Sequence, residues 1–385
     1  MPPAHLLVVT TNYAETEGGV EMHLRSLLPR LVARGVAVTV VYLGQRRESW
    51  TEECGVRVIP LRRWLDFRNI IALPSPREWR SFGRTVAGGL PGSPAVTRIA
   101  THTRFFPLSY LGVRLARRLR VPSIHTEHGG GFVVTSSTLV EAASKAVDLT
   151  IGRAVLRGAT AVVGVSQVSR RFVARLSGVT ALPFTNGIDL ARWLPAPASP
   201  LPATPDDRRL VFIGRIVAEK GWRTFLDAAA GCRQRGWRGE TWLVGDGLER
   251  AEALAYAESI GLERLVAPGH LPPDEVRDAL RGAVYVNPSV ASEGFQLTLV
   301  EALAAGAAVA TYPVGVAPEL AEVPGAAIAI VDLGDAEGLA AAVRTQLAAA
   351  VPVPTREQYA SWDWDTVADT YVAILRRAGE RPLGR

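Results

Sequence analysis

The chain has 385 residues, of which 48% are hydrophobic and 21% are charged. This length exceeds what a single hydrophobic core normally fills, so we expect two domains. The 36 glycines and 26 prolines are ordinary counts that exclude collagen-like and low-complexity proteins. The recurring apolar runs exclude global disorder. The two cysteines, Cys54 and Cys232, are too few for a disulfide framework or a four-thiolate zinc site.

The sequence also carries information on location. The first residues, MPPAHLLVVTTNYA, lack the basic start and the long apolar run of a secretion signal. The longest uncharged stretch, residues 302–318, is too short and too interrupted by glycine and proline for a membrane span. We therefore expect a cytoplasmic protein with free thiols, either dissolved or held peripherally at the inner face of the membrane.

Charge is unevenly distributed along the chain, whose net charge is +6. Residues 1–190 contain 24 lysines and arginines against 12 aspartates and glutamates, whereas the remainder contains 19 against 25. This asymmetry favours contact of the basic half with an anionic partner such as an anionic membrane. A solvated basic surface explains the charge equally well.

The first half of the chain alternates between strand and helix patterns. A short buried strand, LLVVTTNYA, leads through Gly18 and Gly19 into a helix over residues 20–35 with apolar residues at helical spacing. Strand, helix and strand in this order predict a doubly wound, parallel sheet. Further strands are expected within residues 36–44, 56–61, 93–102, 121–128 and 159–166, and further helices at 109–119 and 138–156.

A proline-rich linker, residues 195–207, separates the halves, and the alternation then restarts. We therefore predict an α/β protein of two facing Rossmann-like doubly wound domains, residues 1–194 and 208–360, with an interdomain cleft. A C-terminal segment, residues 361–385, follows them. Strands are expected within 208–215, 240–247, 265–271, 284–289 and 307–313, and helices at 222–236, 250–261, 274–283, 298–306 and 364–377.

In open α/β sheets, ligands bind beyond the carboxyl ends of the strands, so the loops there should carry the chemistry. Arg215 and Lys220 share one such loop. A guanidinium forks two donors onto phosphate oxygens and an ammonium adds a point charge, so together they would offset the charge on a diphosphate leaving group. The alternative is a solvated basic loop.

A second loop contains Glu293 and Gly294, with Glu301 about two turns into the helix that follows. Free N–H groups at a helix start favour an anion, and a glycine allows a ligand to approach the backbone. The two carboxylates would then hold hydroxyls of a sugar and of a ribose. A helix cap with an additional surface glutamate is the alternative explanation.

Two loops of the first half are also candidates. Backbone amides at Gly18 and Gly19 could wrap a phosphate, although the GxGxxG pattern of dinucleotide binders is missing. His128 ends a strand before three glycines, which suggests close substrate approach. An ordinary turn and a structural histidine are the alternatives, and for His102 and His125 we favour a structural role. The sequence motifs predict no metal site.

Taken in order, these loops resemble glycosyltransferase family 4, a group of retaining enzymes with the GT-B fold, over nearly the whole chain. The sequence departs from the family at Gln296 and Thr298, where small or apolar residues are common, and at residues 314–319, which only loosely match its Gly-Gly-x-Pro-Glu turn. The matching segments are Gly18-Gly19-Val20-Glu21, Thr126-Glu127-His128-Gly129, Ser166, Thr185-Asn186-Gly187-Ile188-Asp189, Gly214-Arg215, Glu219-Lys220-Gly221, Gly245-Asp246-Gly247, Glu293 and Glu301.

The resemblance implies an acceptor-binding first domain, a nucleotide-sugar-binding second domain, and a C-terminal helix that crosses back to the first. It implies a diphosphate clamp of Arg215 and Lys220, with Glu293 on the donor sugar, Glu301 on the ribose and His128 near the reacting centre. The implied catalytic residues are His128, Glu293, Arg215 and Lys220. Further implied donor contacts are Gly18, Gly19, Gly245, Gly269, His270, Gly294, Phe295, Gln296, Leu297 and Thr298.

The implied reaction moves a sugar from a nucleotide diphosphate sugar, a UDP- or GDP-sugar, to a hydroxyl of a glycan, glycolipid or natural product. No cofactor, metal or nucleic-acid partner is expected. Alternatives are another GT-B enzyme such as a sugar-nucleotide epimerase or a phosphorylase, a membrane-associated lipid mannosyltransferase, a dinucleotide oxidoreductase, and a non-catalytic sensor. Residues 61–84 combine arginine with Trp, Phe and Ile, which fits a membrane surface, an acceptor lid or an amphipathic helix packed on its own sheet.

Overall fold

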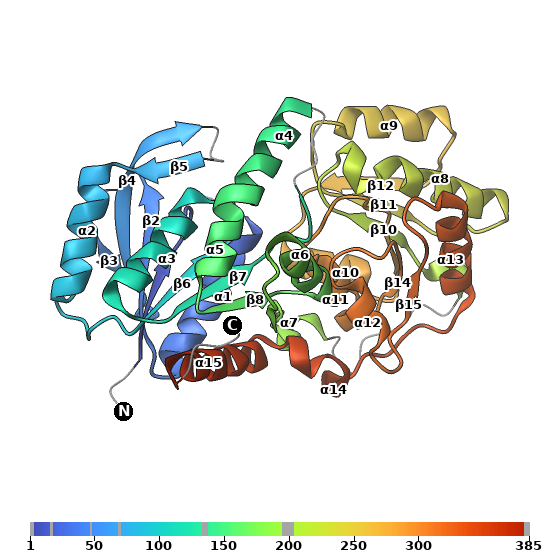
Figure 1. The fold of residues 1–385 in the computed structure, drawn as a ribbon. Coiled ribbons are helices and arrows are strands. Elements are labelled where there is room, and N and C mark those ends of the chain that lie inside the picture. Colours follow the sequence, from blue (N-terminus) through green and yellow to red (C-terminus); the bar gives the residue numbers. More distant parts are fainter. Residues whose placement is uncertain are drawn as a thin grey trace. The chain divides into compact units, whose positions relative to one another are not determined.

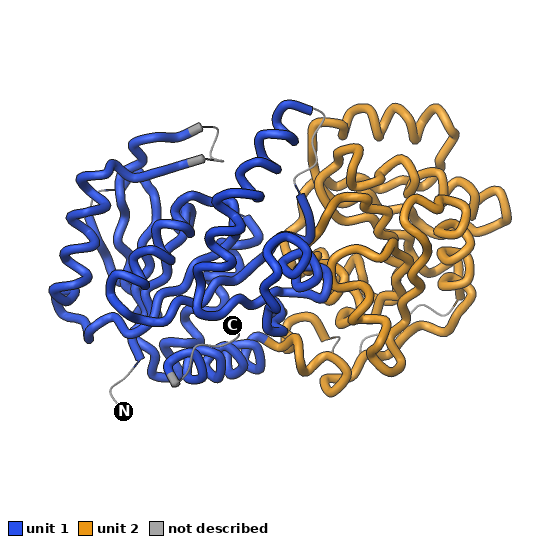
Figure 2. The backbone as a smooth tube through the Cα atoms, viewed as in Figure 1, with its two compact units in different colours: residues 1–187, 364–385 blue, residues 188–363 orange. Residues whose placement is uncertain are grey.

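The computed structural model describes residues 4–15, 18–46, 48–67, 71–132, 138–194 and 204–380. It divides into two compact units, which are coloured separately in Figure 2. Unit 1 comprises residues 1–187 and 364–385, and unit 2 comprises residues 188–363. The chain thus changes units at residue 187, before the expected boundary at residue 194. Residues 195–203 of the expected linker lie outside the described residues.

Unit 1 is built on a mostly parallel sheet in the order β3-β4-β2-β1-β6-β7-β8-β9, with β5 paired to β4 (Figure 1). Among the strands that the structure describes in unit 1, the β3–β4 and β4–β5 pairs are antiparallel and the others are parallel. The apolar runs become central strands, since β1 is buried along its whole length. The strands are β1 (His5–Val9), β2 (Ala37–Gly44), β3 (Trp50–Thr51), β4 (Arg57–Phe67), β5 (Ile71–Pro74), β6 (Arg98–His102), β7 (Ser123–Glu127), β8 (Ala161–Gly164) and β9 (Leu182–Pro183).

Helices connect these strands, and their ends follow ordinary capping chemistry. The Ser166 hydroxyl accepts a hydrogen bond from Ser169 N at the start of α6, and Gly178 ends that helix in the left-handed conformation. The C-terminal helix α15 belongs to unit 1 and packs on α1. The helices are α1 (Gly19–Ala33), α2 (Pro76–Gly88), α3 (Pro107–Leu119), α4 (Thr138–Val147), α5 (Arg153–Gly158), α6 (Gln167–Ser177) and α15 (Trp364–Glu380).

Unit 2 contains an entirely parallel sheet in the order β12-β11-β10-β13-β14-β15. This is the strand order of a Rossmann fold. The strands are β10 (Leu210–Ile213), β11 (Thr241–Val244), β12 (Leu265–Gly269), β13 (Val284–Asn287), β14 (Ala308–Thr311) and β15 (Ile328–Ile330). The helices are α7 (Leu190–Trp193), α8 (Trp222–Gln234), α9 (Arg250–Ser259), α10 (Pro273–Leu280), α11 (Leu297–Ala304), α12 (Ala317–Ala321), α13 (Ala336–Ala348) and α14 (Arg356–Tyr359).

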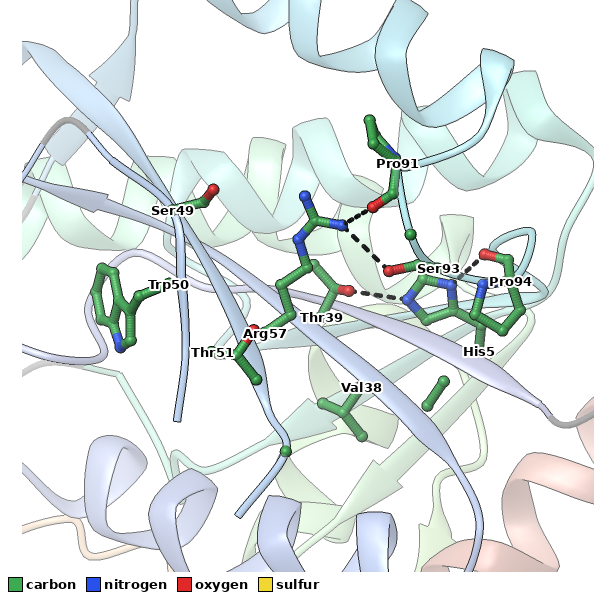
Figure 3. A pocket seen from close by; sticks show the side chains of 13 residues that line it. His5, Val38, Thr39, Ser49, Trp50, Thr51, Arg57, Pro91, Ser93 and Pro94 are labelled. Carbon is green, nitrogen blue, oxygen red and sulfur yellow. Dashed lines mark hydrogen bonds between the residues drawn. The ribbon is translucent and has the colours of Figure 1, made fainter. Parts of the chain in front are cut away.

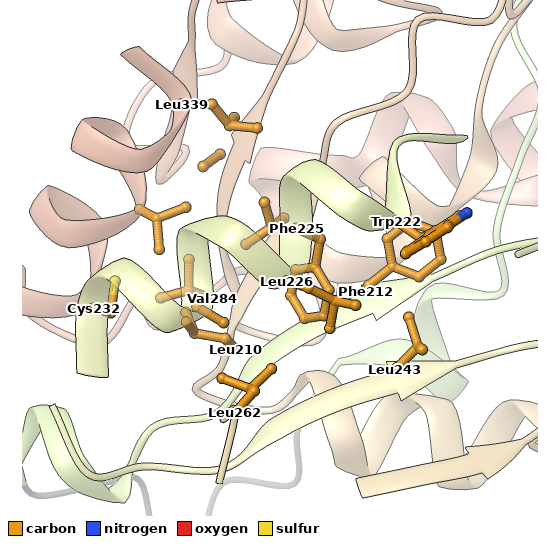
Figure 4. Packing of buried hydrophobic residues seen from close by; sticks show 14 of the residues in the cluster. Leu210, Phe212, Trp222, Phe225, Leu226, Cys232, Leu243, Leu262, Val284 and Leu339 are labelled. Atoms are coloured by element: carbon orange, nitrogen blue, oxygen red, sulfur yellow. The ribbon is translucent and has the colours of Figure 1, made fainter. Parts of the chain in front are cut away.

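Each unit has its own hydrophobic core. In unit 2, the side chains of α8 pack against the inner strands, with Phe225 beside Phe212 and Leu226 fully buried (Figure 4). The core of unit 1 joins strand residues such as Leu7 and Val41 to α2 and α3. The prediction of two doubly wound α/β domains is therefore confirmed.

One local prediction was wrong, and one of the alternatives for residues 61–84 is excluded. The single helix expected over residues 138–156 is interrupted by a π-helical turn, Asp148–Gly152, between α4 and α5. Residues 61–84 do not form one amphipathic helix, because they contain the end of β4, the strand β5 and the start of α2. The apolar side of α2 carries Phe82 and Val86 into the core of unit 1. Among the described residues, no helix combines the length and the hydrophobicity needed to cross a membrane.

Candidate functional site

The strand order of unit 2 changes direction between β10 and β13, which is where ligands bind in open α/β sheets. The loop after β10 carries Lys220, and the loop after β13 carries Glu293. The Lys220 ammonium donates a hydrogen bond to the Glu293 carboxylate in a partly buried ion pair, with side chains 17% and 25% exposed. The structure thus brings together two residues that are 73 positions apart in sequence.

Backbone contacts hold these two loops against each other. Val290 N donates to Glu219 O over 2.9 Å. Gly221 adopts a left-handed conformation with φ +74°, and a Cβ there would overlap Pro288 O. Only glycine fits this crossing, because any side chain would collide with the backbone of the neighbouring loop. The Lys220–Glu293 pair is therefore positioned by the main chain.

Arg215 lies in the same loop as Lys220, and its side chain is exposed. Within the described ranges its guanidinium makes no hydrogen bond or ion pair, so its donors remain available to a ligand. The neighbouring strand ends fix its backbone, since Ile216 N donates to Asp246 O (2.9 Å) and Gly245 N donates to Gly269 O (2.8 Å). Gly245 and Gly269 therefore line the same carboxyl edge.

His270 directly follows Gly269 and is exposed. Gly294 and Phe295 are buried before α11, and Leu297 and Thr298 form its first turn. The structure gives a reason for the family departure at Gln296. Its side-chain amide forms two hydrogen bonds, of 3.0 and 2.7 Å, with the amide of Asn287 at the end of β13. This pair joins the strand end to the helix start.

Glu301 lies in the second turn of α11. Burial raises its pKa to about 7, although the positive charge of Arg192 acts in the opposite direction. A carboxyl group with a strongly shifted pKa at such an edge is a candidate for ligand binding.

Unit 1 repeats this topology, because its strand order changes direction between β1 and β6. Gly18 and Gly19 follow β1 at the start of α1, where Gly18 is the N-cap residue. Gly19 is exposed, and a Cβ on it would meet no atom within 4 Å. The surrounding chain therefore leaves room at this helix start.

His128 follows β7 and belongs to a cluster of three imidazoles with His23 of α1 and His102 of β6. His102 Nδ1 lies 3.2 Å from His128 Nε2, and the rings of His23 and His128 meet edge to face with centroids 4.9 Å apart. Burial lowers the pKa of His23 to about 4, against a smaller opposing effect of Asn186. Burial, aided by the neighbouring histidines, holds the pKa values of His102 and His128 well below their usual range.

A buried ion cluster supports the loop of His128. The Arg104 guanidinium donates to Glu127 and Asp148, each over 2.8 Å, and all three side chains are at most 1% exposed. Glu127 also accepts from Gly129 N over 2.7 Å. Burial alone would raise the pKa of Glu127, but the charge of Arg104 and the donors of His125 and Gly129 bring it to about 2. The cluster fixes the turn that follows His128.

Sequence reasoning missed His23, Arg104 and Asp148 and treated His102 as structural. A usable signal existed for His102, because it ends β6, the strand beside β7 that precedes His128. His125 does have the expected structural environment, buried between Thr101 and Glu127.

A cavity of about 570 Å³ in unit 1 lies elsewhere (Figure 3). It is lined at the amino ends of β1, β2 and β4 by His5, Thr39 and Arg57. Its polar groups bond to each other, with His5 Nε2 2.9 Å from Thr39 Oγ1 and Arg57 donating to Ser93 Oγ over 3.2 Å. It contains none of the predicted site residues.

Two family models match the chain. One described as Glycosyltransferase Family 4 matches residues 17–192, and one described as Glycosyl transferases group 1 matches residues 207–349. Together the two models cover all the candidate loops described above. They do not extend to α15.

Several characterised proteins are similar in sequence. The 2-deoxystreptamine glucosyltransferase of Streptomyces kanamyceticus is 39% identical over 124 residues, which are 30% of this chain and 32% of that protein. The phosphatidyl-myo-inositol mannosyltransferase of Mycolicibacterium smegmatis is 30% identical over 214 residues, 54% of each. The matches therefore span between about a third and about half of these relatives.

Solved structures share the fold over nearly the full chain. The sucrose-phosphate synthase of Thermosynechococcus elongatus superposes with a TM-score of 0.72 at 21% identity, covering 97% of this chain and 98% of that one. Anabaena HepE in complex with UDP also gives 0.72, at 17% identity, covering 97% and 100%. Both have the GT-B architecture of two Rossmann-like domains.

Proposed function

The chain belongs to glycosyltransferase family 4 and has the GT-B fold, and we propose that it transfers a sugar from a nucleotide diphosphate sugar to an acceptor hydroxyl with retention of configuration. The observation that carries this proposal is the Lys220–Glu293 pair at the point where the sheet of unit 2 changes strand order. A cation and a carboxylate held there by backbone contacts match the two halves of such a donor, its diphosphate and its sugar.

In the proposed reaction, unit 2 binds the donor. Arg215 and Lys220 bind the diphosphate and stabilise its growing negative charge as the glycosidic bond breaks. Glu293 accepts hydrogen bonds from hydroxyls of the donor sugar, and Glu301 from those of the ribose. The loops at Gly245, Gly269 and His270, together with residues 294–298, form the remaining walls of the donor site. When the diphosphate binds, it competes with the Glu293 carboxylate for the Lys220 ammonium. Donor binding therefore rearranges this ion pair.

Unit 1 supplies the acceptor site, with the backbone of Gly18 and Gly19 beside a phosphate and His128 beside the reacting carbon. A double displacement needs a free carboxylate as nucleophile. The carboxylate nearest in sequence to His128 is that of Glu127, which is fully buried and occupied by Arg104. This occupation supports front-face attack, in which the leaving phosphate takes the proton of the acceptor hydroxyl and the protein positions the reactants.

The names of the relatives suggest the acceptor class. 2-Deoxystreptamine and myo-inositol are both six-membered carbocycles bearing several hydroxyls, and they are named as the acceptor units of similar proteins. We therefore propose an acceptor that presents a cyclitol or sugar hydroxyl, either free or on a lipid head group. For a lipid acceptor, the basic first half of the chain and the exposed Trp64 of β4 would provide peripheral contact with an anionic membrane.

The proposal is tested by comparing Arg215→Ala with Arg235→Ala. Both arginines are exposed in unit 2, but Arg235 lies at the end of α8, away from the carboxyl edge of the sheet. Losing a charge-assisted contact of about 1.5–3 kcal/mol should weaken nucleotide binding roughly 10- to 100-fold. Thermal shift with UDP, GDP and dTDP, each with and without a sugar attached, measures the binding and identifies the donor base.

We expect Arg215→Ala to unfold at the parental temperature without nucleotide and to lose the nucleotide-induced shift, whereas Arg235→Ala should retain it. Lys220→Ala and Glu293→Ala should lose most transfer while staying folded. Product formation that requires acceptor, with an anomeric configuration matching that of the donor by NMR, separates transfer from epimerisation. Full nucleotide affinity in Arg215→Ala would refute the assignment of the donor site.

A further inference from the structure

The three imidazoles of His23, His102 and His128 come from three separate elements and meet where the strand order of unit 1 changes direction. One nitrogen of each ring lies within 4.8 Å of the others. These are three of the six histidines in the chain. They lie far apart in the sequence, so tertiary packing brings them together.

The geometry of the closest pair fits coordination of a metal ion. Zinc–imidazole bonds are 2.0–2.1 Å long, so two nitrogens on one tetrahedral ion are about 3.3 Å apart. The observed separation of His102 Nδ1 and His128 Nε2 is 3.2 Å. One nitrogen of His23 lies within 4.8 Å of the other two ligand atoms, so its ring must move closer to complete the coordination.

The hydrogen bonding of the cluster is incomplete. His23 and His102 are only 2% and 1% exposed. Yet neither ring nitrogen of His23 makes a well-formed hydrogen bond in the part of the chain that the structure describes, although Asn186 interacts with the ring. Buried polar atoms without partners cost free energy, and a bound ion is one of the recognised reasons for them. Asn186 Oδ1 is also buried without a well-formed hydrogen bond among the described residues and is available to accept the second N–H of a coordinated His23.

We propose that His23, His102 and His128 form a binding site for one divalent transition-metal ion of the zinc type, which plays no part in the transfer reaction proposed above. Neutral imidazole is the ligand form that such ions prefer. His128 is half-buried whereas the other two rings are buried, so the ion enters from the His128 side and keeps an open fourth position there.

The test is a titration of the full-length chain, free of any histidine tag, with Co²⁺, which reports four-coordinate binding through its visible spectrum. We expect one Co²⁺ per chain, displaced by Zn²⁺. Loss of a ligand should weaken binding by more than the roughly 10- to 100-fold that loss of an outer-shell partner costs. His23→Gln removes a buried ligand, and His128→Ala removes the half-buried one and spares the core, which keeps the test valid if the first variant folds poorly.

Two matched controls address the other soft ligands of the chain. His270→Ala removes an exposed, solitary imidazole, and Cys54→Ser removes a partly accessible thiol. Both should bind Co²⁺ like the parent. Absence of binding by the parent, unchanged affinity in His23→Gln or His128→Ala, or a thiolate-to-cobalt band that vanishes in Cys54→Ser would each overturn the proposal.

A second measurement relates the metal site to the role proposed above for His128. If His128 acts near the reacting centre, stoichiometric Zn²⁺ should inhibit transfer, and a chelator should restore it. Metal binding without inhibition would refute the role of His128 but leave the metal site intact. The cobalt spectrum tests whether the metal site exists even if the chain has no transfer activity.

Discussion

The partly buried carboxyl group of Glu301 should make nucleotide binding depend on pH. Because its pKa is raised to about 7 from the ordinary 4.5, the folded chain holds a proton that the unfolded chain releases between these values. This group therefore lowers the free energy of unfolding as the pH rises from about 4.5 through 7. The ionised form accepts ribose hydroxyls, so nucleotide affinity should increase over the same interval.

Glu301→Gln should remove both effects. The variant should melt at a higher temperature than the parent at pH 8 and at nearly the same temperature at pH 4.5. Its affinity for UDP or GDP should be lower at pH 8 and nearly independent of pH. Melting curves and calorimetric titrations from pH 4.5 to 8 measure this, with exposed Glu337→Gln of α13 as the control. An equal pH slope in parent and Glu301→Gln would contradict the assignment.

Some residues of the candidate sites could be predicted from the sequence and others could not. Lys220 and Glu293 could be predicted as one site, since each follows a strand and parallel strands end at a common edge. His23 could not, because it lies inside a helix among apolar residues and meets His102 and His128 only through tertiary packing. Arg104 was equally hidden, as no local pattern marks an arginine that will be buried between Glu127 and Asp148.

The helix α15 offers a direct comparison of buried and exposed positions on one element. Ala368 is fully buried in unit 1, whereas Asp369 pairs with Arg34 of α1 over 2.6 Å with 70% of its side chain exposed. Ala368→Asp places an uncompensated charge in the core and should cost about 3–5 kcal/mol. Asp369→Ala breaks an exposed pair worth about 0.2–1 kcal/mol. Urea unfolding of unit 1 by tryptophan fluorescence measures both, and similar costs would contradict the packing described for α15.

Among the elements, the buried strands and the amphipathic helices were the most predictable. The helix over residues 138–156 was predicted without its π-helical turn, because that turn is defined by its i→i+5 backbone hydrogen bonds, which residue types do not reveal. That turn contains Asp148, which reaches Arg104 from it. The hairpin of β4 and β5 was missed because Arg63 and Asp66 give the segment a mixed polar pattern, which does not identify a strand at the edge of a sheet.

The division into two units predicts how the molecule responds to truncation. Among the described residues, the main hydrophobic cluster of unit 2 is formed by residues between 210 and 347, whereas unit 1 needs α15, whose Tyr371 and Leu375 are 1% and 2% exposed. Residues 188–363 should therefore fold alone with a cooperative thermal transition. A chain ending at residue 363 should keep that transition and lose the one of unit 1. Calorimetry of both fragments checks this, and an intact unit 1 transition in the truncated chain would contradict it.

The overall architecture could be predicted because alternating strands and helices leave few topologies. The return of the C-terminal helix to unit 1 was implied by the family resemblance and agrees with the structure. It could not be derived from the residues alone, since no feature within residues 364–377 indicates which sheet the helix will cover. In the structure, the burial of Ala368 and the hydrogen bond from Arg34 to Asp369 place this helix on unit 1.

The late position of α15 in the chain has a consequence for biosynthesis. While the polypeptide emerges from the ribosome, residues 188–363 become available as a contiguous stretch before α15 has been translated. Unit 2 can thus acquire its native packing first, although nascent domains generally mature from the amino terminus onwards. Until α15 has been translated, the face of α1 on which it packs stays uncovered. We therefore expect chaperones to bind the incomplete unit 1 during synthesis.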